Sequence, residues 1–230
     1  MLITTWTSPQ LAGLAAMLGA LLYAIGDVLL LAGRAEPARH PNLQPHARLL
    51  SGTERMAELS WPRLMWGGLL GVFATPLLLG SLWLLYAGLA PAGPWAAWPP
   101  TLLFGLGFIL APFVHGSFIY LGEYVQALDR VGAEAQAVIV GMLQRHRQVM
   151  IISYGALAAT IVTASFWFSA AVLLGGTRFP AWMALVNPIT ALLAWLGLRR
   201  LIPAAAKRLE GAGFNIAFLA FFAAATVALR

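Results

Sequence analysis

The chain has 230 residues, of which 60% are hydrophobic and only 10% are charged; because globular domains carry about 25% charged residues, this composition excludes a water-soluble domain and indicates an integral membrane protein. The absence of cysteine excludes disulfides, thiolate nucleophiles, Cys-ligated zinc and iron–sulfur clusters. The net charge of +6 is scattered over several loops, which favours membrane topology and contact with anionic lipid over nucleic-acid binding.

Apolar runs of about 20 residues predict helices that cross a bilayer. We predict an all-α integral membrane protein whose single transmembrane domain, residues 1–230, is a six-helix bundle. The N-terminus has no basic region and no small-residue cleavage site follows the first apolar run, so we expect no removable signal peptide. The expected helices cover roughly 11–33, 64–90, 101–125, 149–174, 181–201 and 212–229.

Two connecting segments are longer than simple loops. Segment 34–62 opens with three prolines, so we expect a loop followed at best by a short interfacial helix over 47–59. In segment 126–148 apolar residues recur at spacings of three and four, from Val131 to Leu143, with charged residues elsewhere. This pattern predicts an amphipathic helix between the third and fourth spans, lying on the inner membrane surface or leading into the fourth.

The lysines and arginines are distributed unevenly over the segments between the expected helices. With the N-terminus outside, twelve of the 14 lie in segments 34–63, 126–148 and 199–211, and two lie on the other side. This is the bias of the positive-inside rule. We therefore expect a multi-pass protein of the bacterial inner membrane, with both termini outside.

Asp27 is the first candidate for a functional side chain. Ala12, Ala16, Ala20 and Ala24 form a small-residue ridge along the first helix, which lets another helix approach closely. Asp27 follows that ridge, so it points into the bundle at a depth of about 9 Å. A carboxylate at that depth is costly and functional by default. A structural role, with Asp27 bonded to neighbouring helices or paired with Arg63, stays open.

The third helix carries His115 and Glu123 eight residues apart, so they are expected to share one face. His115 lies too deep to reach water, whereas Glu123 lies near the cytoplasmic end and can snorkel. Tyr120, Tyr154 and Asn215 are expected at similar inner depths. The sequence therefore predicts an inward-facing polar pocket in which Asp27 and His115 meet, with Glu123 nearer its mouth.

Neither a metal site nor a cofactor is expected. Apart from His115, the histidines lie in or beside loops, and none forms an HExxH or similar pair. A G-x-S-x-G elbow and a phosphate-binding loop are also missing from the sequence. No motif therefore names a reaction.

Four segments together resemble a bacterial integral-membrane family catalogued as a domain of unknown function: AIGDVLLLAG (24–33), WPRLMWGGLLGVFATPLLLG (61–80), HGSFIYLGE (115–123) and GFNIAFLAFF (213–222). This resemblance implies a multi-helix inner-membrane protein and no particular activity. A second, partial resemblance joins GDVLL (26–30) and the stretch from His115 to Tyr120 to the lysoplasmalogenase family, which hydrolyses vinyl-ether lysolipids. The chain departs from that family in its smaller number of helices, so no catalytic residues are carried over.

Three functions remain open. The first is a protein that binds or passes a lipid headgroup or a small polar molecule in the inward-facing pocket. The second is an intramembrane hydrolase or lipid-modifying enzyme with Asp27 or His115 as general base. The third is a structural subunit of a membrane complex. Membrane lipids are the expected partners in each case, and association into a homo-oligomer is left open.

Overall fold

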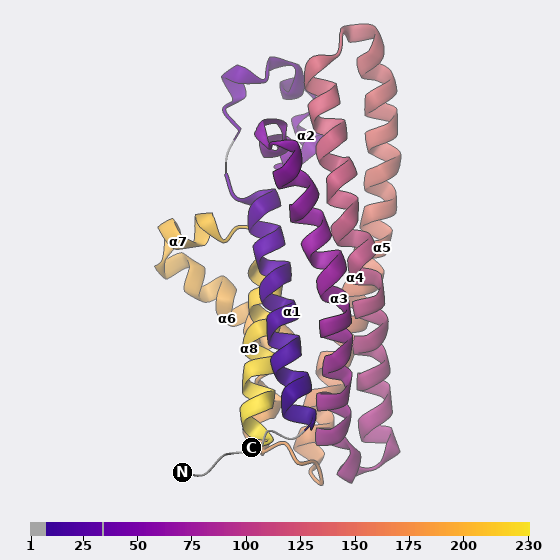
Figure 1. Cartoon of the computed structure of the whole chain (residues 1–230), viewed down its shortest axis with the longest axis vertical. Helices are drawn as coiled ribbons and strands as arrows, with labels where there is room; N and C mark the ends of the chain where they lie inside the picture. The colour runs from indigo at the N-terminus through magenta and orange to yellow at the C-terminus, as the bar shows by residue number, and fades with distance from the viewer. Residues whose placement is uncertain (1–7, 34) are drawn as a thin grey trace.

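The computed structural model describes residues 8–33 and 35–230, and every regular element in these ranges is helical. Figure 1 shows a bundle elongated along the helix axes, with α1 beginning and α8 ending at the same end, here called the terminal end. The α-helices are α1 (Ser8–Leu31), α2 (Ala47–Leu50), α3 (Trp61–Leu89), α4 (Pro94–Arg130), α5 (Ala133–Leu174), α6 (Pro188–Leu201), α7 (Pro203–Arg208) and α8 (Gly213–Ala228).

Four of these helices are long and apolar enough to cross a membrane: α1, α3, α4 and α5. The other two expected crossings are shorter. The α6 helix has 14 residues and α8 has 16, which correspond to about 21 and 24 Å, against a hydrocarbon core of about 30 Å. An all-helical fold with four candidate membrane-spanning helices is thus shown, whereas the six-crossing count is not confirmed.

The expected helix over 181–201 is interrupted at Asn187. The Asn187 side chain accepts hydrogen bonds from the backbone N–H groups of Ile189 and Thr190, and Thr190 bonds back to the N-cap backbone. Pro188 occupies the first helical position, where its missing N–H costs nothing. A capping box therefore begins α6 at Pro188, and residues 181–185 form only a short 3-10 helix, η5 (Ala181–Leu185).

The expected amphipathic helix over 131–143 is not a separate surface helix. Its residues from Ala133 onward are continuous with the 42-residue α5, and α4 and α5 project together beyond the rest of the bundle (Figure 1). Leu143 is fully buried against neighbouring elements, while Val138 is 63% exposed. The apolar stripe packs partly on protein, which keeps this segment along the bundle axis.

Segment 37–58, here called the cap, covers the end of the bundle opposite the terminal end. It contains short helical segments: η1 (Pro37–Arg39), η2 (Pro41–His46), α2 and η3 (Thr53–Glu58). Apolar residues of the cap, among them Leu43, Leu50 and Met56, are buried in one cluster with residues of α1, α3, α4 and α5. In place of the short interfacial helix expected over 47–59, the structure has two separate short helices, α2 and η3, which pack on protein.

His40 joins the cap to the end of α4. Its Nδ1 lies 2.7 Å from Oδ2 of Asp129, and its Nε2 lies 3.2 Å from Oε1 of Glu58. Both ring nitrogens face carboxylate oxygens, so the imidazolium satisfies both. The hydrogen bond to Asp129, with a further contribution from Glu58, raises the pKa of His40, and the hydrogen bond from His40 lowers the pKa of Glu58.

The long helices are arranged as an open ring. Neighbours pack in the order α8, α1, α3, α4 and α5, and among the described residues no comparable packing joins α5 back to α8. Towards the terminal end aromatic rings close this seam, because Phe168 of α5 contacts Phe221 of α8 at a centroid distance of 5.2 Å. Towards the cap end the α5–α8 seam stays open, and this is where the candidate site lies.

Candidate functional site

Asp27 is placed inside the bundle by the small residues of α1. Ala16 and Ala20 have no exposed surface, and a Cβ on Gly26 would lie 2.6 Å from the carbonyl oxygen of Gly67. Because the α1 and α3 backbones approach so closely, the face of α1 that carries Asp27 is closed to lipid. Only 8% of the Asp27 surface remains exposed.

His115 lies in a hollow made by glycines on two neighbouring helices. A Cβ added to Gly71 would lie 2.5 Å from the His115 Nδ1 atom, and one added to Gly26 would lie 2.8 Å from its Cε1. Tyr23 packs edge-on against the imidazole with ring centroids 4.9 Å apart. The glycines of α1 and α3 therefore provide the space for this ring, which is only 6% exposed.

The partners of the two ring nitrogens fix where protons reside. The His115 Nδ1 atom is 3.1 Å from the carbonyl oxygen of Gly68, which can only accept, so Nδ1 carries a hydrogen and donates it. The Nε2 atom lies 3.3 Å from Oδ1 of Asp27. With Nδ1–H directed at Gly68, Nε2 is an acceptor in the neutral imidazole and a donor in the imidazolium.

The contact between Asp27 and His115 is an electrostatic one. Although 3.3 Å is within ion-pair distance, the direction is poor, and Nε2 is a buried atom without a hydrogen-bond partner among the described residues. The two polar groups are close, but the hydrogen-bonding direction of Nε2 is left for another partner. The sequence-based expectation that these two side chains lie close together is correct.

Asn215 of α8 completes the cluster. Its Nδ2 group donates to Oδ2 of Asp27 at 2.6 Å. Each carboxylate oxygen of Asp27 thus faces a side chain from a different helix, Oδ1 facing α4 and Oδ2 facing α8. Arg63, considered as a partner for Asp27, instead donates to the carbonyl oxygens of Leu29 and Ala32 at the end of α1, which caps that helix.

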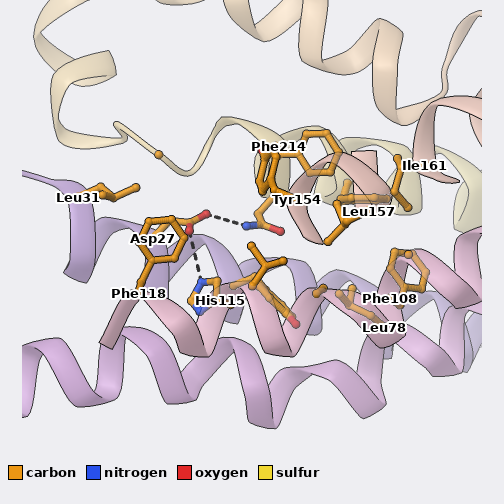
Figure 2. Close-up of a pocket in the computed structure, with 17 residues that line it drawn as sticks. Asp27, Leu31, Leu78, Phe108, His115, Phe118, Tyr154, Leu157, Ile161 and Phe214 are labelled. Atoms are coloured by element: carbon orange, nitrogen blue, oxygen red, sulfur yellow. Dashed lines mark hydrogen bonds and ion pairs between the residues drawn. The ribbon is translucent and has the colours of Figure 1, made fainter. Parts of the chain in front are cut away.

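A cavity of about 320 Å³ extends from this cluster along the α5–α8 seam. Its polar end is formed by Asp27, His115 and Asn215, and Tyr154 of α5, which is half exposed, also lines it. The remaining wall is mostly aliphatic and aromatic, and Figure 2 shows several of these side chains around the space. The apolar lining includes Leu31, Leu78, Phe108, Phe118, Leu157, Ile161, Phe214 and Phe218.

Two of the predicted site residues lie elsewhere. Tyr120 is 62% exposed, Glu123 is exposed, and neither lines the cavity. Helix geometry explains the error, since each residue turns the helix by about 100°. Five residues place Tyr120 about 140° from His115, and eight place Glu123 about 80° from it, so these side chains do not share its face.

Three neighbours of the cluster were not predicted as site residues. The Gly68 carbonyl orients His115, and the Tyr23 hydroxyl donates to Oγ1 of Thr75 at 2.7 Å, since Thr75 itself donates to the Gly71 carbonyl. Glycines at 67, 68 and 71 allow neighbouring helices to approach closely. Their spacing on one helix was the available signal, but it does not say which side chain fills the space they leave.

Comparison with known proteins agrees with the sequence resemblance. The family described as "Family of unknown function (DUF6796)" matches residues 8–230. The chain belongs to this family. No curated protein and no solved structure matches the chain, and the partial likeness to lysoplasmalogenases is not shown. Membership of DUF6796 brings no activity with it, so the function has to be argued from the site.

The chemistry available at this site is hydrogen bonding at one buried imidazole nitrogen. Within residues 8–33 and 35–230, no group of three or more His, Asp or Glu side chains gathers that could hold a metal ion. Asp27 already has a partner at each oxygen, so it is not an open anion for a cationic ligand. The Nε2 position of His115 is the polar atom that remains to be satisfied.

Proposed function

We propose that the protein is a polytopic inner-membrane protein that binds an amphiphilic lipid-like molecule in the α5–α8 seam. The polar group of the ligand forms a hydrogen bond with Nε2 of His115, and its apolar part fills the remainder of the cavity. The observation that carries this proposal is the buried Nε2 atom of His115, which lacks a hydrogen-bond partner at the polar end of a cavity of about 320 Å³.

The lining of the cavity favours an amphiphile over a small polar molecule. Polar side chains occupy one end, and aromatic and aliphatic side chains form the rest of the wall. A wholly polar ligand would lose its hydration along that wall without compensation. A hydroxyl group matches the polar end of the cavity, because it can either accept a hydrogen bond from Nε2 or donate one to it.

Access from the bilayer is the natural route to this cavity. The cavity lies in the seam between α5 and α8, on the cap side of the contact between Phe168 and Phe221, and Tyr154 is half exposed there. A lipid molecule can therefore enter laterally, without crossing a water layer. We place the cap on the cytoplasmic side because twelve of the 14 lysines and arginines lie in segments assigned to that side, with α6 and α8 as short additional crossings.

A steric block tests the proposed function. Ala111 lines the cavity, so Ala111→Phe should fill part of it while leaving the polar cluster unchanged. Ala159→Phe adds the same volume at an exposed position of α5 outside that lining and is the matched control. Native mass spectrometry of the detergent-purified proteins should show one retained lipid-sized molecule in the wild type and in Ala159→Phe, and its loss from Ala111→Phe. Equal retention by all three would contradict the proposal.

A further inference from the structure

Arg147 of α5 is a cation whose charge no acidic side chain balances. No carboxylate of the described residues lies within ion-pair distance of it. Its Nη2 group is 3.4 Å from Oγ of Ser51, and its Nη1 atom is buried without a hydrogen-bond partner in the described part of the chain. A guanidinium with an unsatisfied donor is a strong recognition element for phosphate and carboxylate oxygens.

The position of Arg147 along α5 matches the headgroup level of a bilayer. Arg147 is 27 residues from Leu174, where α5 ends, which corresponds to about 40 Å of helix. A bilayer including its headgroup regions is about 40–45 Å thick. If the Leu174 end of α5 lies at one membrane surface, Arg147 lies among the headgroups of the opposite leaflet.

Arg147 also lines an apolar groove of about 470 Å³ between α5, α4 and the cap. Leu50 and Ser51 come from the cap, Leu121 from α4, and Ile151 from α5. Ile151 is 64% exposed, so the groove is continuous with the surface that the bilayer covers. A free inorganic anion would gain nothing from these apolar walls, whereas an acyl chain would bury surface against them.

The backbone at Ser51 holds its hydroxyl against this cation. Ser51 ends α2 in the left-handed conformation at φ 49°, and it is the one non-glycine residue with positive φ in the described ranges. Its hydroxyl donates to the Arg48 carbonyl, so its oxygen accepts from Arg147. The guanidinium is thus held on one side by the cap while its other donor lacks an acceptor.

We propose that this groove binds an anionic phospholipid, with the phosphate group on Arg147 and an acyl chain along the apolar wall. This site differs from the cavity of the proposed function, because it recognises an anion instead of a hydroxyl group. Phe118 and Tyr154 line both spaces, so these two rings form a common wall. The site does not depend on the occupant of the α5–α8 seam.

The test uses the full-length protein in detergent and measures binding of phosphatidylglycerol and phosphatidylcholine with the same acyl chains. Arg147→Gln is compared with Arg145→Gln, a matched control because Arg145 is exposed and lies two residues earlier on the same helix. We expect the wild type and Arg145→Gln to prefer phosphatidylglycerol and Arg147→Gln to bind it about tenfold more weakly, as the loss of a charge-assisted contact predicts.

Two further measurements keep this proposal open to refutation. Ser51→Gly, which relieves the backbone at φ 49°, is expected to fold and to weaken binding less than Arg147→Gln does. Millimolar inorganic phosphate is expected not to displace the lipid. Equal binding by Arg147→Gln and Arg145→Gln, equal affinity for both lipids, or displacement by inorganic phosphate would overturn the assignment of an anionic phospholipid site.

Discussion

Replacing the two central side chains, singly and together, tests the physical basis of the site. Asp27→Asn leaves the His115 Nε2 atom facing an amide, and His115→Gln leaves a buried carboxylate whose one remaining partner is Asn215. Each single replacement should lower the free energy of unfolding. The double replacement should lower it by less than the sum, because removing one partner already removes the interaction.

The expected coupling can be estimated from the geometry. Opposite unit charges at 3.3 Å attract by about 5 kcal/mol at an effective dielectric constant of about 20. Desolvation of the two buried groups offsets part of this attraction, and the poor hydrogen-bond direction removes more. We therefore expect a coupling free energy of about 1–3 kcal/mol, within the range measured for residues in contact.

The assay is equilibrium unfolding in mixed micelles with increasing detergent denaturant, followed by tryptophan fluorescence. Asp27→Asn combined with Ser165→Ala is the control cycle, because Ser165 bonds to the Ile161 carbonyl within α5 and has no contact with the cluster. That control should be additive to within about 0.5 kcal/mol. Additive effects for Asp27 and His115 as well would refute the electrostatic reasoning.

Three further predictions concern the surroundings of the site. Gly71→Ala should lower the free energy of unfolding by about 1–3 kcal/mol, because its Cβ would lie 2.5 Å from the buried imidazole, whereas Gly80→Ala, with no atom within 4 Å of the new Cβ, should not; equal melting temperatures would contradict this. Asn187→Ala should cost about 1 kcal/mol through loss of the α6 cap, and thermal unfolding that matches the wild type would show that the cap contributes nothing. The two carboxylate partners of His40 raise its pKa. The contribution of His40 to the free energy of unfolding is therefore complete below the unfolded pKa of about 6.5 and is lost as pH rises through the higher folded pKa. The wild type should exceed His40→Gln in stability near pH 6, and a difference independent of pH would refute this.

The parts of the fold that follow from chain-wide periodicity could be predicted from the sequence. Long apolar runs predicted the four spanning helices α1, α3, α4 and α5, and the Ala ridge of α1 predicted that Asp27 points inward. Both arguments need only the helical repeat and the cost of exposing polar groups in a bilayer. The ends of these helices were predicted less accurately. The hydropathy of an apolar run does not show where a helix ends once it extends beyond the membrane.

The errors have local physical causes. The capping signal at Asn187 and Pro188 is present in the sequence, but the expected helix over 181–201 runs through it instead of starting there. The apolar stripe around Leu143 was expected on the inner membrane surface or leading into the fourth span; the second alternative holds, and a sequence does not show that the cap folds against this stripe. Glu123 was placed with His115 because an eight-residue spacing was treated as one face, although it leaves a rotation of about 80°.

The candidate site depends on contacts between distant parts of the chain. Depth along the helices brought Asp27, His115 and Asn215 into one list, and the structure joins them directly. Depth gives no information on rotation about the helix axis, so Tyr120 entered the same list although it faces away. The imidazole tautomer is fixed by the backbone carbonyl of Gly68. Because every residue has a backbone carbonyl, this contact leaves no signal in the sequence.

The most direct test of the central claim is a high-resolution structure of the protein crystallised from a lipidic mesophase. We expect continuous density for an amphiphile in the α5–α8 seam, with a hydroxyl oxygen within about 3.2 Å of the His115 Nε2 atom and an apolar chain beside Leu157 and Ile161. A cavity that holds only ordered water, or an Nε2 atom satisfied by a protein group in the lipid-bound crystal, would contradict the account.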